Sequence, residues 1–205
     1  MSGSGPFQDK PSLRVEGLML SRGARTLVRD LSFTAAAGDL VEVRGPNGSG
    51  KTTLLRALAG FFKPQGGRLA YEGVEEPALA LHYVGHVPAL KGAASVRAHV
   101  CYWQGLFGVT ARDSVTIAAF GLIKQAALPV RALSQGQQRR LALARLHLAA
   151  RPIWLLDEPA AGLDADGREM LAEFIESHRL QGGIAIAAVH GALGPPPSRT
   201  VTLGA

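Results

Sequence analysis

Short apolar runs alternate along the chain with segments of helical periodicity. The apolar runs are typical of β-strands and cover residues 40–43, 81–84, 153–156 and 184–189. Three of the four are almost continuously apolar, which favours parallel strands that are covered on both faces. Helical periodicity predicts helices over residues 51–59, 135–150 and 168–180. This alternation of strand, loop and helix predicts an α/β fold with a mainly parallel sheet.

One long segment does not follow this alternation. Residues 89–130 lack a strong strand signal and contain helix-like pieces at residues 95–106 and 114–127. We therefore expect a helical insertion between two strands of the sheet, and a helical subdomain over about residues 89–150.

The two ends of the chain are also distinct in composition. Residues 1–12 are small and polar, so we expect a flexible tail, followed by a single domain over residues 13–205. Three consecutive prolines precede residues 199–203, which predict a short edge strand.

Composition narrows the class of protein. The 205 residues are 47% apolar and 19% charged, which excludes a disordered chain. The single cysteine, Cys101, excludes a disulfide scaffold and a cysteine-based zinc cluster. No apolar run approaches the ~18–20 residues of a membrane helix. The net charge of +6 suits phosphates, nucleic acid or an anionic membrane, and it does not choose among them.

The first chemical motif is the string GPNGSGKTT, between the strand LVEVR and the helix TTLLRALAG. A glycine-rich loop between a strand and a helix is the context of a phosphate-binding P-loop. Its amides can turn toward phosphate oxygens, Lys51 can reach the β- and γ-phosphates, and the Thr52 hydroxyl suits Mg²⁺. The predicted cradle consists of Gly45, Pro46, Asn47, Gly48, Ser49, Gly50, Lys51, Thr52 and Thr53.

A pair of acids ends the buried strand of IWLLDEP. At a strand's carboxyl end, Asp157 would face Mg²⁺, usually through water, and Glu158 would orient or deprotonate an attacking water. Pro159 ends the strand at this point. Solvated acids at a strand end are the alternative, and the P-loop makes the catalytic interpretation the stronger one.

The string LSQGQQRRLALARLHLAA predicts a helix that begins after Ser134 as N-cap. Its Arg139, Arg140 and Arg145 add positive charge, as on an ordinary helix with a solvated basic face. The serine hydroxyl, the free first-turn amides and Gly136 also suit an anion site.

In this order, GPNGSGKTT, LSQGQ and IWLLDEP resemble the Walker A, signature and Walker B motifs of ABC-type ATPase domains. The resemblance covers about residues 13–204, and the signature string separates the chain from kinases and GTPases. It implies a P-loop NTPase fold with a mainly parallel core sheet, an N-terminal antiparallel β part and a helical insertion.

The resemblance also implies a homodimer in which two such domains enclose two ATP molecules, with Mg²⁺, head to tail. Ser134, Gly136 and Gln137 would then contact the γ-phosphate that the partner's P-loop holds. The string AGLD at residues 161–164 is similar to the D-loop of the dimer interface. His190, after the strand IAIAAV, is similar to the switch histidine that contacts the γ-phosphate.

Two positions depart from the pattern of the family. Arg22 stands where an aromatic residue usually stacks on adenine, and a guanidinium group can also lie flat on a base. His86 stands where the Q-loop glutamine usually contacts Mg²⁺ and the attacking water. A neutral histidine accepts a hydrogen bond at one ring nitrogen and donates at the other, so His86 could take that place.

Within the family, the chain resembles the ATP-binding subunits of cytochrome c maturation systems, which are also called haem exporter ATPases. The strings LSFTAAAGDLVEVRGPNGSGKTTLLRALAG and LSQGQQRRLALARL and the Gly-His pair at the Q-loop carry this resemblance. It implies a peripheral homodimer on the cytoplasmic face of the inner membrane, bound to integral membrane subunits. ATP hydrolysis would drive haem export or release of a haem-loaded chaperone.

Three other functions remain open at this point. One is an ABC transporter subunit for another cargo, because cargo specificity lies in the membrane partner. A second is a non-transport ABC ATPase acting on nucleic acid, but a single ATPase unit without a long coiled-coil insertion argues against it, so no nucleic acid partner is expected. The third, a binder that does not cleave ATP, disagrees with the presence of both Lys51 and Glu158.

Overall fold

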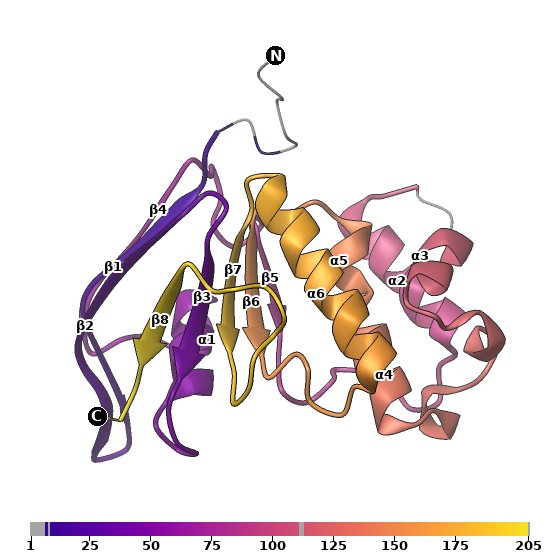
Figure 1. Ribbon diagram of the computed structural model, residues 1–205, viewed down its shortest axis with the longest axis horizontal. Coiled ribbons are helices and arrows are strands. Elements are labelled where there is room, and N and C mark those ends of the chain that lie inside the picture. The colour runs from indigo at the N-terminus through magenta and orange to yellow at the C-terminus, as the bar shows by residue number, and fades with distance from the viewer. Residues whose placement is uncertain (1–6, 8, 111–112, 205) are drawn as a thin grey trace.

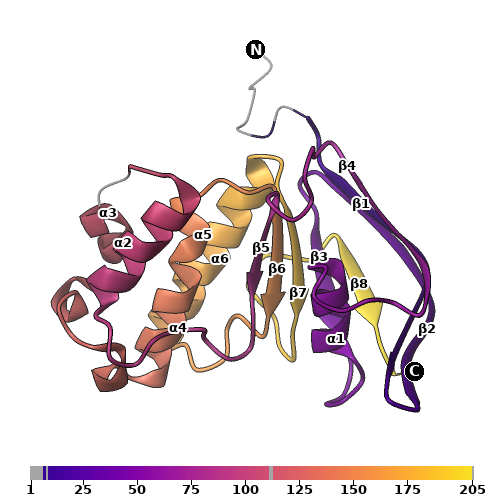
Figure 2. The ribbon, with the colours of Figure 1, turned by 180° about the vertical axis from the view of Figure 1, so that it is seen from behind.

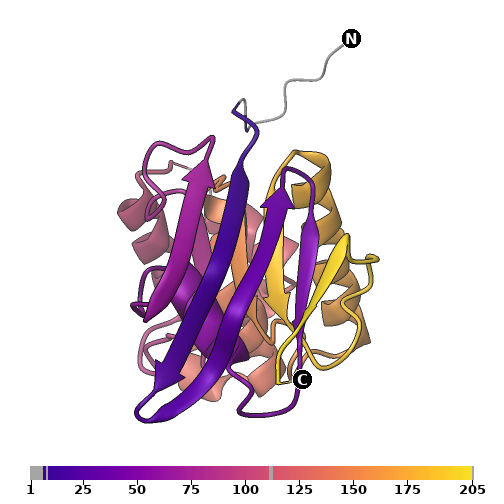
Figure 3. The same ribbon diagram turned by 90° about the vertical axis from the view of Figure 1, so that its left-hand side faces the viewer.

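The computed structural model describes residues 7, 9–110 and 113–204, and two β-sheets form its framework (Figure 1). The first is a three-stranded antiparallel sheet in the order β2-β1-β4, which lies nearest the viewer in Figure 3. Its strands are β1 (Ser12–Arg22), β2 (Arg25–Ala36) and β4 (Gly66–Glu72). The antiparallel N-terminal part that the sequence predicted is confirmed.

The second sheet has five strands, and all of its neighbouring strands are parallel. The order is β5-β6-β7-β3-β8, with β3 (Leu40–Arg44), β5 (Leu81–Val84), β6 (Ile153–Asp157), β7 (Ile184–Ala188) and β8 (Arg199–Thr202). The predicted strands are confirmed to within one residue at each end. Because parallel strands end at the same edge of a sheet, the segments after β3, β6 and β7 meet there.

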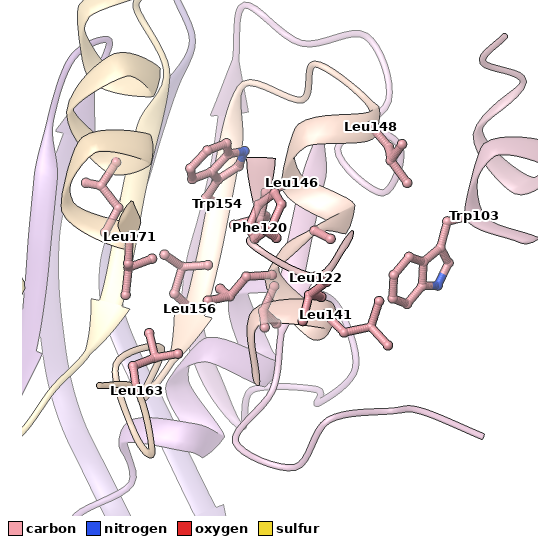
Figure 4. Packing of buried hydrophobic residues seen from close by; sticks show 14 of the residues in the cluster. Trp103, Phe120, Leu122, Leu141, Leu146, Leu148, Trp154, Leu156, Leu163 and Leu171 are labelled. Carbon is pink, nitrogen blue, oxygen red and sulfur yellow. The ribbon is translucent and has the colours of Figure 1, made fainter. Parts of the chain in front are cut away.

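The continuous apolar runs arise because both faces of the parallel sheet are covered. Along β6, Ile153 and Leu155 pack in the cluster formed with α1 (Lys51–Leu58) and the antiparallel sheet. The alternate residues Trp154 and Leu156 pack in the other cluster, against the helices (Figure 4). Successive side chains of a strand point to opposite faces, so a strand between two cores is apolar at every position.

The helices lie mainly on one side of the parallel sheet, as Figures 1 and 2 show from opposite directions. They are α2 (Val96–Phe107), α3 (Asp113–Ala119), α4 (Gln135–Leu143), α5 (Arg145–Leu148) and α6 (Ala165–Leu180). The helical character expected for the segment between β5 and β6 is thereby confirmed. Among residues 7, 9–110 and 113–204, no helix has the length and apolar character needed to cross a bilayer.

Three predicted boundaries are wrong. The helix expected over residues 135–150 is interrupted at Ala144, which separates α4 from α5. The second insertion helix ends at Ala119, and the short 3-10 helix η1 (Ile123–Gln125) follows it.

The last of the three wrong boundaries is the start of α6, which begins three residues earlier than predicted. Asp164 caps it by accepting a hydrogen bond from the amide of Gly167 at 3.0 Å. Of the predicted tail, residues 1–6 and 8 lie outside the described residues, and β1 already begins at Ser12.

Candidate nucleotide site

The loop between β3 and α1 depends on two glycines. Gly45 has a φ of 147°, and a Cβ at this position would lie 2.4 Å from the carbonyl oxygen of Leu203. Gly50 has a φ of 105° and forms the N-cap of α1 without a side-chain hydrogen bond. The first amides of α1 therefore keep their hydrogen-bonding capacity for an anion, at the positive end of the helix dipole.

Lys51 begins α1 and is only 6% exposed. Its Nζ donates hydrogen bonds to the carbonyl oxygens of Gly45 at 2.7 Å and Pro46 at 3.2 Å. The ammonium group thereby lies against the loop that the motif predicts to hold phosphate.

A cleft of about 1080 Å³ opens beside this loop. It brings together most of the predicted site residues, which come from β1, the P-loop, the loop after β5 and the ends of β6 and β7: Arg22, Asn47, Gly48, Gly50, Lys51, Thr52, Thr53, His86, Asp157, Glu158 and His190. Arg25, Arg56 and Arg145 line the cleft as well. Basic side chains outnumber the two carboxylates in this wall, which favours a polyanionic ligand.

The hydroxyl oxygen of Thr52, on α1, lies beside the carboxylate of Asp157 at the carboxyl end of β6. The hydroxyl of Thr52 donates a hydrogen bond to Oδ2 of Asp157 at 2.9 Å, and Asp157 is 1% exposed. Hydroxyl and carboxylate oxygens are the ligands that Mg²⁺ prefers. The described residues contain no group of three or more histidine, cysteine or acidic side chains able to hold a metal ion. A Mg²⁺ ion here would take its other ligands from phosphate and water.

Glu158 lies between two histidines in the cleft. His190 Nε2 is 3.0 Å from its Oε1, and His86 Nδ1 is 3.2 Å from its Oε2. The backbone of Glu158 has a φ of 50°, in the left-handed region that non-glycine residues avoid. Its amide donates to the carbonyl of Ala188 on β7 at 3.0 Å. The carboxylate is thus held at both of its oxygens, and the backbone beneath it is held by the sheet.

The signature turn is not part of this cleft. Ser134, Gly136 and Gln137 line a separate hollow of about 580 Å³, together with Gly162 and Asp164. A capping box fixes the turn, because Ser134 Oγ accepts from the Gln137 amide at 3.2 Å and Gln137 Oε1 accepts from the Ser134 amide at 3.0 Å.

Two further predicted site residues have clear places in the structure. Arg22 is exposed near the tip of the β1–β2 hairpin, where it pairs with Arg25 at the edge of the cleft. Ser49 is buried at the back of the P-loop and lines a neighbouring hollow beside Leu203 and Gly204 instead of the main cleft.

The prediction that Arg139 belongs to a solvated basic face is wrong. The residue is only 3% exposed. Its guanidinium group donates to carbonyl oxygens of two segments, residues 85–86 and 157–159. A signal was present in the helical period, since Arg139 lies three and four residues before the buried Ala142 and Leu143.

This fold, with a P-loop after β3, a carboxylate pair at the end of β6 and a capped helix outside the cleft, defines an ABC-type ATPase domain. The model of the family described as ABC transporter matches residues 28–161, which is more than half of the chain.

The similar proteins belong to one subgroup of the ABC transporter family. The cytochrome c biogenesis ATP-binding export protein CcmA of Maricaulis maris is 44% identical over 209 residues, which cover 97% of each chain. The protein of the same name from Rhizobium meliloti is 43% identical over 89% of this chain and 92% of its own. The chain therefore belongs to the ABC transporter family, among the CcmA-type ATP-binding export proteins. It is an ABC ATPase that binds ATP, and its class works with membrane permease subunits.

Solved structures share the fold at lower sequence identity. A putative ABC transporter ATP-binding protein from Pyrococcus furiosus has a TM-score of 0.81 at 24% identity and covers 94% of this chain and 97% of its own. A bacterial Atm1-family ABC exporter, solved with ATP bound, has a TM-score of 0.80 at 22% identity. It covers 95% of this chain, and this chain corresponds to 37% of that one.

Proposed function

We propose that two copies of this chain enclose ATP between the P-loop cleft of one copy and the Ser134 turn of the other, and hydrolyse it there. The observation that carries the proposal is that the P-loop cleft and the Ser134 turn lie in separate hollows of one chain. The P-loop, Asp157 and Glu158 line one cleft, and the capped turn of α4 lies in another hollow. A second copy would bring a Ser134 turn to each cleft.

Each group of residues in the cleft has a separate role in ATP hydrolysis. Lys51 and the amides at the start of α1 hold the phosphates. Glu158, with its carboxylate oriented by His190 and His86, positions or deprotonates the attacking water. Arg22 stacks on the adenine base. The oxygens of Thr52 and Asp157 would hold Mg²⁺. When bound, Mg²⁺ would neutralise charge on the phosphate oxygens.

His86 takes the place of the Q-loop glutamine in this proposal. Its ring nitrogen lies within hydrogen-bonding distance of Glu158, so it can orient the same carboxylate and water that an amide would contact. The side chain is 58% exposed, which also leaves it open to the solvent side of the cleft.

The narrower function follows the relatives named above. We infer that the homodimer lies on the cytoplasmic face of the inner membrane, bound to integral membrane subunits, and that ATP hydrolysis serves cytochrome c biogenesis. The cargo would be haem itself or a haem-loaded chaperone that is released. Identity of 42–45% to proteins with this one name supports the assignment.

Cross-linking between two copies tests the shared site. In a chain with Cys101→Ser and Glu158→Gln, one preparation carries Asn47→Cys and the other carries Ser134→Cys. We expect a disulfide-linked heterodimer when the two are mixed with ATP and Mg²⁺, because the P-loop of one copy would then face the Ser134 turn of the other. Denaturing gel electrophoresis without reductant measures the product.

The matched control for this experiment replaces Ser134→Cys with Ser177→Cys, on an exposed position of α6. This pair should give no ATP-dependent product. Equal yields from the two pairs, or a Ser134 product that forms equally well without ATP, would refute the shared site.

The biological assignment requires cells that lack the chain. We expect these cells to lose covalently bound haem in their c-type cytochromes, as measured by haem staining of membrane proteins. The wild-type chain should restore the staining and Lys51→Ala should not, because the variant lacks the ammonium group at the phosphate loop. Full restoration by Lys51→Ala, or unchanged staining in the deleted cells, contradicts the assignment.

A further inference from the structure

The buried guanidinium group of Arg139 has an unusual set of partners. Nε donates to the carbonyl oxygen of Pro159 at 3.1 Å, and Nη1 donates to those of Gly85 at 2.8 Å and His86 at 3.3 Å. Nη2 donates to the carbonyl oxygens of Asp157, at 2.6 Å, and Glu158. Guanidinium has five N–H donors, and five main-chain carbonyls receive them.

These carbonyls belong to the two segments that carry His86 and Glu158. The segments are far apart in sequence, and Arg139 joins them from α4, beneath the carboxylate and imidazole that lie 3.2 Å apart at the cleft. Glu158 also has the disfavoured φ of 50°, which persists only when the surroundings fix it. The hydrogen bond from Arg139 to its carbonyl is one such constraint, beside the bond from its amide to Ala188 and the bond that its carbonyl accepts from the Ala161 amide at 3.1 Å.

The burial of Arg139 is itself costly. Burial lowers its pKa, whereas the nearby charges of Asp157 and Glu158 raise it. A stable core at this position of α4 needs only an apolar side chain, as Ala142 and Leu143 show on the same face. A planar fork with five donors can serve carbonyls of two main-chain segments at once; an apolar side chain has no donor, and a lysine has only three, all on one nitrogen.

From this geometry we propose that Arg139 is a positioning residue for ATP hydrolysis, which sets Glu158 and His86 relative to one another through their main chains. It does not touch the nucleotide. This inference rests on the proposed role of Glu158 as the residue that acts on the attacking water.

The test compares Arg139→Gln and Arg139→Lys with the wild-type chain, in the complex with its membrane subunits. For Arg139→Gln we expect kcat to fall about 10- to 100-fold, because a displaced Glu158 no longer meets the water in line. The Kd for ATP should change less than about threefold, since Lys51 and the α1 amides are untouched. Arg139→Lys keeps the charge but has three donors for the five carbonyls, so its kcat should lie between those of wild type and Arg139→Gln.

A matched control is available at the opposite end of the same sheet. Arg151 Nη1 donates to the carbonyl of Leu81, at the start of β5, at 2.7 Å, and its guanidinium group lies over Phe107. Arg151→Gln therefore removes a comparable hydrogen bond from an arginine to a β5 carbonyl without touching residues 85–86 or 157–159. We expect its kcat to stay within twofold of wild type at a temperature where both proteins are folded.

A double-mutant comparison separates positioning from a general structural role. If Arg139 acts through Glu158, adding Arg139→Gln to Glu158→Gln should lower the residual rate less than twofold. A further loss as large as in the wild-type background overturns the proposal. A normal kcat in folded Arg139→Gln, or a parallel loss of ATP affinity, also overturns it. Failure of both Arg139 variants to fold, while Arg151→Gln folds, makes Arg139 a structural residue and has the same consequence.

The same measurements distinguish this inference from the proposed function. If Glu158→Gln hydrolyses ATP at the normal rate, the assignment of Glu158 fails, whatever Arg139 does. If Glu158→Gln is inactive and Arg139→Gln is normal, only the positioning role fails.

Discussion

Glu158→Gln is expected to reduce ATP turnover at least about 100-fold and to leave ATP binding intact. The carboxamide has nearly the shape of the carboxylate, so it fits between His86 and His190. It lacks the negative charge and the basic oxygen needed to polarise water. The groups that hold the phosphates, Lys51 and the first amides of α1, lie elsewhere in the cleft and are unchanged.

The same variant should accumulate an ATP-bound dimer, because ATP that is not cleaved continues to hold the two copies together. Turnover is measured by phosphate release, and dimer formation by size-exclusion chromatography with light scattering in ATP and Mg²⁺. Glu75→Gln, at an exposed position between β4 and β5, is the matched control and should behave as wild type. Normal phosphate release by Glu158→Gln would show that another group acts on the water.

The strands and the phosphate site could be predicted because their causes are local in sequence. Each strand of the parallel sheet is sandwiched between two cores, so its apolar run is visible without knowledge of the fold. The P-loop needs Gly45 and Gly50 at backbone positions that other residues avoid, and Lys51 directly after them. Asp157 and Glu158 end a buried strand, and the topology of the sheet places them beside the P-loop.

The parts that the sequence did not reveal depend on contacts between distant segments. The five carbonyl groups that accept hydrogen bonds from Arg139 lie in two other segments of the chain. The helical period around residue 139 indicates that the side chain is buried, but it does not indicate these partners. The interruption at Ala144 is equally hidden, because the apolar period continues through Leu146 and Leu148. The start of α6 was missed although Asp164 is a good N-cap, since the string AGLD was interpreted only as an interface loop.

Acidification is expected to lower the free energy of unfolding by several kcal/mol through two buried histidines. His82 is 2% exposed and has its Nε2 3.0 Å from the carbonyl of Ala149. His178 is 5% exposed and stacks on Trp154, with ring centroids 3.8 Å apart. Burial lowers the pKa of each ring from 6.5 to about 4, against the smaller opposing effect of hydrogen bonds to main-chain carbonyls.

A depressed histidine pKa means that the unfolded chain binds more protons than the folded chain between about pH 6.5 and pH 4. Stability is therefore complete above the unfolded pKa and is lost as the pH falls toward the folded pKa. From these shifts each histidine should contribute a loss of about 2 kcal/mol between pH 7 and pH 5. Urea unfolding at the two pH values measures the difference.

Variants of His82 and His178 show how much of the fall in unfolding free energy between pH 7 and pH 5 arises from their imidazole rings. His178→Phe keeps an aromatic ring against Trp154, and His82→Phe keeps one against Phe107, whose ring centroid lies 5.4 Å away. Each should reduce the difference in unfolding free energy between pH 7 and pH 5 by about 2 kcal/mol, whatever it costs at pH 7, because a phenyl ring binds no proton. If His178→Phe and His82→Phe keep the full pH dependence, the acid sensitivity arises from other groups.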